Sequence, residues 1–521
     1  MYLKKKFLTI IQFFIIFFFP LAINQYYANQ GLFPMESFAY YDIPFRILKG
    51  DVPFLDFWVV SGIFIDYIQS IFFFFLGKSF QVYVLHASLF NSFLTLLTFY
   101  FLKKINVDKK LAFYFSLLFC MVAYPSSGTL YVDHHASLLC LAAIYFFIIF
   151  FLYEKKKNLF ISLLFLSFSF LTKVVPAAYV GLIILLFFFI KIIYEKKFFY
   201  IKDLFFYSLS IFVFIIFFML FLGIPLKDFV VQYLLFPITI GKERYLNDLI
   251  NFGNLNTYKF IFIPFVVSLF LVFKKNENIK KLYMLKLMIL IFLSFILAMY
   301  LHQVLTKNQE FIFFVIPVLI SLIILQLRFF SFRNKKVLNL VLIIFCSLVI
   351  LKYHLRFNEN RKFHELENIS LEKSLEASMI SSNFIGLRWI TSQYPDNPKV
   401  EINNINNILN FLEKENLNNS MLVTNYPFFS VLLDRNLNTP GRWFDENGGG
   451  YPIKKNNIYF LKYQNFLIKL IERKKIFKIY INSTIGEDVI FRYINIDCFI
   501  LLNQIENLKI FVLKNNNCAL N

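Results

Sequence analysis

The chain has 521 residues, of which 59% are hydrophobic and 16% are charged, and its formal net charge is +21. This composition excludes an ordinary soluble protein, in which about 25% of the residues are charged. The positive charge does not indicate a nucleic acid partner, because Lys and Arg gather in short runs between long apolar segments. The sequence therefore predicts an α-helical, polytopic protein of the lipid bilayer.

Hydropathy predicts about eleven transmembrane helices. They cover residues 7–24, 80–102, 111–125, 136–152, 158–172, 175–193, 204–222, 259–273, 283–301, 311–327 and 337–352. The short ones, such as 158–172, suit tilted or partial spans. We expect the first segment to be a retained helix rather than a cleaved signal peptide, because no small-residue cleavage site follows it.

Basic residues mark every second loop, which sets the expected orientation. The runs include Lys4-Lys5-Lys6, Lys103-Lys104, Lys155-Lys156-Lys157, Lys196-Lys197, Lys274-Lys275 and Lys335-Lys336. By the positive-inside rule these loops and the N-terminus are cytoplasmic. The loop 25–79, the short loop 126–135, the segment 223–258 and the region from about 353 are then expected outside.

The C-terminal region is polar, Asn-rich and segmented, unlike the part before it. Helices are predicted at 401–415 and 462–474, and strands at 421–424, 476–481, 497–502 and 508–513. Alternating helices and strands favour a small α/β domain. We therefore divide the chain into a transmembrane part, 1–352, and an extracytoplasmic α/β domain, 353–521.

Two of the five cysteines, Cys498 and Cys518, fall in this outer domain. An oxidising compartment permits a disulfide between them. The sequence does not decide whether the bridge forms.

The loop 25–79 carries five carboxylates between two apolar segments: Glu36, Asp42, Asp51, Asp56 and Asp66. Carboxylates at a membrane surface are costly unless they pair with a cation, a metal or a substrate. The loop is therefore the first candidate for chemistry. The alternative for each acid is a solvated side chain, or a cap paired with Arg46 or Lys49.

A further set of residues carries a resemblance to a known family. These residues are Glu36, Gly50, Pro53-Phe-Leu-Asp56-Phe-Trp58, Ser61-Gly62, Phe75-Leu-Gly77-Lys-Ser79 and, more loosely, Leu171-Thr-Lys173-Val-Val-Pro176. With a first helix, an acidic outer loop, a bundle of spans and a terminal outer domain, the order resembles the GT-C superfamily of integral-membrane glycosyltransferases. The closest type is that of the protein O-mannosyltransferases and aminoarabinose transferases.

The resemblance implies transfer of a sugar from a polyprenyl-phosphate-type lipid carrier. The acceptor would be a glycan, a lipid or a protein on the outer face of the cytoplasmic (inner) membrane. Such a transfer needs a carboxylate that takes the proton of the acceptor hydroxyl. Glu36 matches the position of the family's base, Asp42 is the neighbouring alternative, and Asp56 is a third catalytic candidate.

A second group of candidate residues is Tyr131-Val-Asp133-His134-His135, at the outer start of a span. Asp133 and His134 are of the types that bind a divalent metal. Consecutive residues of a helix point about 100° apart, so all three of Asp133, His134 and His135 cannot hold one ion. An equally good interpretation is an N-cap by Asp133 followed by two imidazoles at the membrane interface.

Cations that stabilise the leaving phosphate are predicted at Lys173, Lys242, Arg244 and His302. Lys173 follows a short span and precedes Pro176, which breaks a helix. The alternative for Lys173 is a lysine that extends to the membrane interface.

Two other classes of membrane protein compete with this interpretation. A polysaccharide polymerase or ligase would also be polytopic, but it would not need acids directly after the first span. A transporter of lipid-linked sugars predicts internal repeats and charged or broken helices in mid-membrane. The sequence shows no repeat and few central charges, which favours the enzyme.

Overall fold

The computed structural model describes residues 2–241, 256–274, 279–306, 311–330, 334–444, 448–482, 484–514 and 518–520. The chain forms two compact units. Unit 1 contains Met1–Ala28, Val84–Ile215 and Arg244–Phe363, and unit 2 contains Asn29–Tyr83, Ile216–Glu243 and His364–Asn521. The boundary expected at residue 353 thus lies near Phe363. Most of the loop 25–79, which is predicted to face outward and is called the first outer loop below, belongs to unit 2 instead of the helical bundle.

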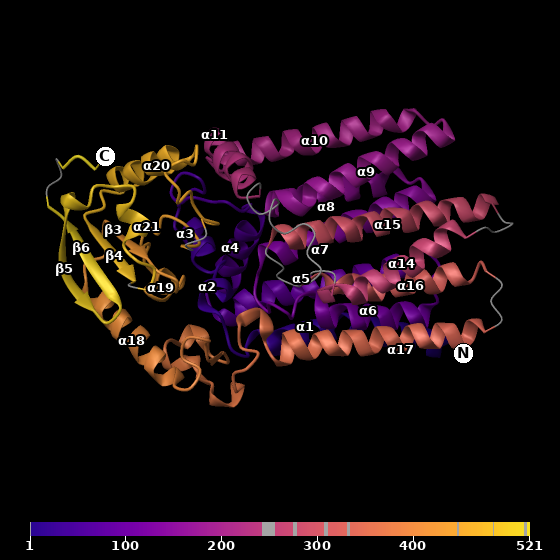
Figure 1. Cartoon of the computed structure of the whole chain (residues 1–521), viewed down its shortest axis with the longest axis horizontal. Coiled ribbons are helices and arrows are strands. Elements are labelled where there is room, and N and C mark those ends of the chain that lie inside the picture. The colour runs from indigo at the N-terminus through magenta and orange to yellow at the C-terminus, as the bar shows by residue number, and fades with distance from the viewer. Residues whose placement is uncertain are drawn as a thin grey trace. The chain divides into compact units, whose positions relative to one another are not determined.

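Unit 1 consists of long helices that run side by side (Figure 1). They are α1 (Tyr2–Ala28), α5 (Phe80–Lys104), α6 (Lys109–Ala123), α7 (Val132–Tyr153), α8 (Lys156–Thr172), α9 (Val174–Glu195), α10 (Phe199–Phe221), α14 (Lys259–Phe273), α15 (Ile279–Leu305), α16 (Val315–Leu327) and α17 (Lys335–His354). Each of the predicted apolar segments overlaps one of these helices. The first residues of α5 and the last of α10 belong to unit 2.

Seven helices in the described part of the chain are long and apolar enough to cross a membrane. Their ranges are Ile10–Ala28, Phe80–Lys104, Val132–Tyr153, Val174–Glu195, Phe199–Phe221, Tyr283–Val304 and Lys335–His364. Shorter apolar helices cover Phe64–Leu76, Lys259–Phe273 and Ile312–Leu327. These helices fit a multi-pass membrane protein, and the number of eleven crossings stays a prediction.

The central and peripheral helices of unit 1 differ in burial as a bundle in lipid requires. Helix α7 is buried over most of its length and packs against α8, α9 and α15. Helix α10 instead exposes large apolar side chains, among them Phe205, Phe206, Phe212 and Phe214. A helix that is apolar all round and yet exposed is suited to a lipid environment.

Surface ion pairs form at the end of unit 1 that carries the basic loops. Lys156 Nζ lies 3.0 Å from an oxygen of Asp203, and Lys197 Nζ lies 2.6 Å from Glu154 Oε1. Helix α7 ends and α8 begins at this end. The start of α7 and the end of α8 therefore lie at the opposite end of the bundle, which is the end predicted to face outward.

Unit 2 contains a four-stranded sheet with the strand order β3-β4-β6-β5. Its strands are β3 (Ser420–Val423), β4 (Lys478–Asn482), β5 (Phe499–Ile505) and β6 (Leu508–Leu513). β3 and β4 are parallel, and the other neighbours are antiparallel. The predicted helices correspond to α18 (Pro398–Lys414) and α20 (Phe460–Arg473), which confirms a small region of helices and strands near the C-terminus.

The first outer loop adds three helices to unit 2: α2 (Pro34–Ser37), α3 (Asp42–Leu48) and α4 (Phe64–Leu76). Further short elements are α11 (Leu226–Phe229), α19 (Phe429–Leu432), α21 (Asp488–Phe491), β1 (Leu375–Glu376) and β2 (Arg388–Trp389). Trp58 of the loop packs into the same apolar core as Met421 and Ile479 of the sheet. The loop is thus an integral part of unit 2.

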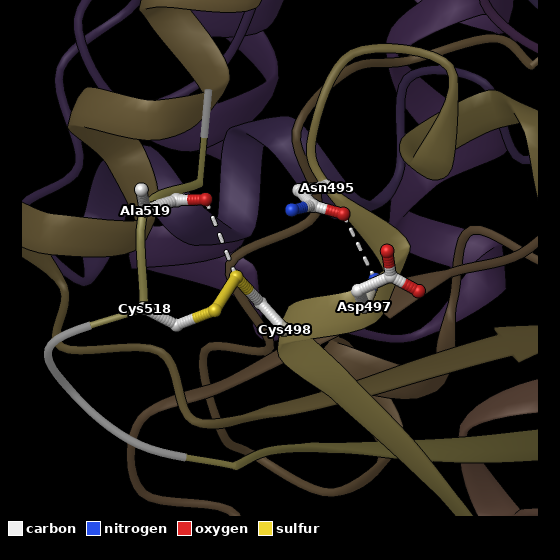
Figure 2. The surroundings of a disulfide bond; sticks show 5 residues. All are labelled: Asn495, Asp497, Cys498, Cys518 and Ala519. Atoms are coloured by element: carbon white, nitrogen blue, oxygen red, sulfur yellow. Dashed lines mark hydrogen bonds between the residues drawn. A yellow bond between two sulfur atoms is a disulfide. The ribbon is translucent and has the colours of Figure 1, made fainter.

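The disulfide that the sequence left open is formed between Cys498 and Cys518, with their Cα atoms 5.6 Å apart (Figure 2). Beside it, the side chain of Asn495 accepts a hydrogen bond from the backbone of Asp497 and caps a single 3-10 turn. The bridge ties the last residues of the chain to the start of β5.

Candidate functional site

Three polar side chains meet in unit 1 at the end of the bundle opposite the basic loops. Asp133, in the first turn of α7, is buried. Its Oδ1 accepts a hydrogen bond from Lys173 Nζ and lies 2.8 Å from Nε2 of His302. An acid, an ammonium group and an imidazole therefore lie together, brought by three different parts of the chain.

The position of Lys173 follows from a break between two helices. Helix α8 ends at Thr172, and Lys173 is extended, with φ −156° and ψ 133°. Val175 is also non-helical because the residue before a proline, here Pro176, is driven away from helical angles. The break directs the ammonium group to Asp133. Lys173 thus forms a specific ion pair and keeps 29% of its side chain exposed.

His302 lies in the last turn of α15 and is fully buried. Its Nδ1 lies 3.4 Å from the hydroxyl of Ser137, one turn after Asp133 in α7. The predicted cations Lys173 and His302 are therefore brought together. Lys242 and Arg244, the other two, lie outside the described residues.

His134 has partners of its own and does not share them with Asp133. Its Nε2 lies 2.9 Å from the hydroxyl of Ser126, and its ring packs on Phe311 with centroids 4.4 Å apart. Its buried Nδ1 has no hydrogen-bond partner in the described part of the chain. The side chains of Asp133 and His134 thus point in different directions and have different partners, as expected for neighbours on a helix.

These side chains do not fit a divalent metal site. The Lys173 ammonium already places a positive charge against Asp133, where a metal would have to bind. Within the described ranges, no group of three or more His, Cys, Asp or Glu side chains is arranged to hold a metal ion. The metal predicted at Asp133 and His134 therefore has no support from the geometry, and we derive no step through it.

His135 and His86 form a second pair of histidines in unit 1, of which only His86 was not singled out from the sequence. His135 Nδ1 lies 2.7 Å from the hydroxyl of Tyr124, and its ring stacks on Phe90 at 3.9 Å. His86 lies 5.1 Å from the His135 ring. The sequence offered one signal for His86, because only six histidines occur in the chain. All six are buried in the structure.

In unit 2, the acids of the first outer loop surround a fully buried arginine. Arg46 Nε donates to Asp51 Oδ2 at 2.9 Å, and Nη2 donates to the carbonyl of Asp56 at 3.3 Å. Lys474 Nζ lies 2.8 Å from Asp51 Oδ1. Burial alone would raise the pKa of the Asp51 carboxyl, but Arg46, Lys474 and Asn436 outweigh it and hold the pKa below its ordinary value.

Asp56 is held by structural contacts. Its Oδ2 accepts a hydrogen bond from Val52 N at 2.7 Å, which closes the turn. Its Oδ1 lies 3.1 Å from Arg473 and 3.0 Å from Lys474, at the end of α20. These contacts account for Asp56 as a turn and ion-pair residue, and its catalytic role stays a prediction without support from them.

Asp42 is buried like Asp51 and Asp56, but it lies farther from a cation than they do. Its Oδ2 is 3.9 Å from Arg46 Nη1, and its Oδ1 has no hydrogen-bond partner among the described residues. Burial raises the pKa of the Asp42 carboxyl above its ordinary value, although Arg46 opposes the shift. Glu36 lies in α2 and is half-buried. Both remain candidates for a base.

A buried ion pair in unit 2 was missed because its members are distant in the chain. Arg442 Nη2 lies 2.7 Å from Asp66 Oδ2, and the guanidinium lies over the ring of Tyr40, 3.9 Å from its centroid. Arg442 also donates to the carbonyl of Ala39 at 2.9 Å. These contacts join the first outer loop to the C-terminal part of the same unit.

No protein-family model matches the chain, and no curated protein matches its sequence.

Proposed function

We propose that the protein is a membrane glycosyltransferase that moves a sugar from a polyprenyl-phosphate-type lipid carrier to an acceptor on the outer face of the cytoplasmic membrane. The proposal is supported by the helical bundle and by the motifs of the first outer loop. The observation that carries it is the group formed by the buried side chains of Asp133 and His302 with the partly exposed Lys173. Ionisable side chains within membrane-spanning helices are expensive and are characteristic of functional sites.

The reaction needs two kinds of help from side chains. A base takes the proton from the acceptor hydroxyl while a bond forms between its oxygen and the anomeric carbon of the sugar. The bond from that carbon to the phosphate oxygen breaks, and the electron pair leaves with the phosphate. Cations stabilise the charge that develops there, and the loss of one such contact typically lowers the rate by about 100- to 1000-fold.

Lys173 and His302 supply N–H groups for the leaving phosphate in this proposal, and Asp133 positions both. The ammonium group of Lys173 is partly exposed, so that it can reach a bound anion. Asp133 Oδ1 contacts both the ammonium group of Lys173 and the imidazole of His302, so it holds the two groups next to each other. The base is predicted at Glu36 or Asp42.

A transporter of a lipid-linked sugar is the second candidate, and one observation favours it. The extended residue Lys173, which connects α8 to α9, places a charge at one end of the bundle. Transporters form ion and substrate sites at interrupted helices. The Asp133–Lys173 pair would supply the charged groups of such a site, although it lies at the end of the spans and not in mid-membrane.

An assay with purified protein in proteoliposomes separates the two functions. The vesicles contain a polyprenyl-phosphate-linked, radiolabelled sugar and acceptors of the glycan, lipid and peptide classes. An enzyme releases polyprenyl phosphate and forms a labelled product. Counterflow of the intact lipid-linked sugar across the vesicle membrane, with no product, would establish the transporter and refute the transferase.

A further inference from the structure

Unit 1 contains a fully buried arginine whose hydrogen-bonding capacity is only partly used. Arg361 follows α17 and a π-helical turn, Leu355–Glu359. Its Nη1 donates to the carbonyl of Pro125 at 3.1 Å. Its Nε and Nη2 have no hydrogen-bond partner in the part of the chain that the structure describes.

The other buried arginines show what is missing at Arg361. Arg46 lies 2.8 Å from a carboxylate oxygen of Asp51, and Arg442 lies 2.7 Å from one of Asp66. Across the described ranges, no Asp or Glu oxygen forms an ion pair with Arg361. Glu359, the acid nearest to it in sequence, accepts a hydrogen bond from Tyr27.

A buried guanidinium without a counter-ion is costly, because its charge has left water without an equivalent partner. Arginine remains charged in proteins, so it cannot relieve this cost by losing its proton. The N–H groups on Nε and Nη2 point to the same side of the planar guanidinium. Together they form the fork that binds two oxygens of one anion.

The surroundings of Arg361 indicate which anion suits the fork. Pro125 immediately precedes Ser126, whose hydroxyl contacts His134 in the candidate site. Arg361 therefore lies at the end of the spans opposite the basic loops. Phosphate groups of lipids lie at the ends of membrane-spanning helices. Arginine recognises phosphate through two parallel hydrogen bonds.

We propose that Arg361 binds a phosphate oxyanion through Nε and Nη2. The anion supplies the charge that the described residues do not provide. Free phosphate and the phosphodiester of a lipid headgroup share this chemistry. The inference does not rest on the proposed sugar transfer, because an anion at Arg361 neutralises the buried charge in either candidate function.

The first test measures thermal unfolding of the purified full chain in detergent as sodium phosphate is raised at constant ionic strength. The midpoint of the wild type is expected to rise to a plateau with phosphate but not with acetate. Arg361→Met should abolish this rise, and it should raise the midpoint without phosphate, because the unpaired charge is gone. Lys352→Met, which removes an exposed cation from α17, is the matched control and should respond like the wild type.

Arg361→Lys keeps the charge but removes the fork, which guards against a Met variant that fails to fold. It should lower the affinity for phosphate by roughly tenfold or more, as expected for a lost charge-assisted contact. Lipid binding forms the second arm. The protein is placed in phosphatidylcholine nanodiscs with or without added phosphatidylglycerol. Native mass spectrometry then counts the phosphatidylglycerol molecules that stay bound to the released protein.

The outcomes of the two arms identify the source of the anion. Saturable stabilisation by soluble phosphate supports a site open to free phosphate. Retention of phosphatidylglycerol by the wild type and by Lys352→Met, but not by Arg361→Lys, supports a lipid headgroup. The inference is overturned if neither arm responds, if acetate acts as well as phosphate, or if the Arg361 variants behave like the wild type.

Discussion

Lys173 donates a hydrogen bond to Asp133 inside unit 1, although the two residues lie forty positions apart in the chain. The contact joins the break between α8 and α9 to the first turn of α7. His302, from α15, lies on the same carboxylate oxygen. The pair is therefore the centre of the candidate site.

Removing one member of this pair should destabilise the protein strongly, because the other is left as a charge without its partner. Asp133→Asn and Lys173→Met are each expected to lower the free energy of unfolding by roughly 3 kcal/mol. The double variant should lose clearly less than the sum of the two. Thermal unfolding in nanodiscs measures this cycle. Strict additivity would show that the two side chains do not interact.

Asp51 should make unit 2 sensitive to acid. Its pKa is held below its ordinary value of about 3.9 because the effects of Arg46, Lys474 and Asn436 outweigh that of burial. Its stabilising contribution is therefore complete above about pH 4. It is lost as the pH falls further through the lowered pKa. Asp51→Asn should cost roughly 2–3 kcal/mol at pH 7 and remove this part of the acid dependence.

Asp42 is the matched control, because its pKa is shifted in the opposite direction. Burial raises the pKa of the Asp42 carboxyl. Ionisation of Asp42 therefore opposes folding at pH values above its ordinary pKa. Asp42→Asn is expected to leave the stability at pH 7 unchanged or higher. The three tryptophans, Trp58, Trp389 and Trp443, all lie in unit 2, and their fluorescence reports its unfolding. An equal loss in both variants would refute the opposite roles of these acids.

The secondary structure could be predicted from sequence because it depends on local patterns. Apolar runs of spanning length and the periodicity of 401–415 anticipate α5, α7 and α18. Lys173 was predicted from the nearby Pro176. For its partner Asp133, the sequence predicts a metal ligand or an N-cap and does not reveal the ion pair with Lys173.

Contacts between distant segments could not be predicted, because no local pattern determines them. Arg361 and Pro125 are separated by 236 positions, and Arg442 and Asp66 by 376. The division of the chain also escaped prediction. The first outer loop joins unit 2 because Trp58 packs into the core around the sheet and Arg46 donates a hydrogen bond to the carbonyl of Thr439.

The disulfide should stabilise unit 2, and its oxidation state in cells should show whether unit 2 lies in an oxidising compartment. Cys498 and Cys518 are twenty positions apart, and a cross-link over such a loop contributes about 3 kcal/mol. Replacing both with Ser should lower the free energy of unfolding by that amount in tryptophan fluorescence. In cells, a thiol reagent should modify the pair only after reduction. Free thiols at both positions without reductant would argue against an oxidising compartment.

The basic loops and unit 2 should lie on opposite sides of the membrane. Lys157→Cys and Lys455→Cys place single thiols at exposed positions, in a chain whose native cysteines are replaced by Ser or Ala. A reagent that cannot cross membranes should label position 455 in spheroplasts, and position 157 only after lysis. Labelling of both positions in intact spheroplasts, or of position 157 alone, would contradict the predicted orientation.

Sugar transfer by matched variants tests the central claim most directly. Asp133→Asn removes the negative charge that positions Lys173 and His302. Asp203→Asn instead breaks the ion pair between Asp203 and Lys156 at the basic-loop end of the same unit. With the lipid-linked donor, kcat/KM is expected to fall at least about 100-fold for Asp133→Asn. It should stay within about twofold of the wild type for Asp203→Asn. Undiminished transfer by a correctly folded Asp133→Asn protein would contradict the account.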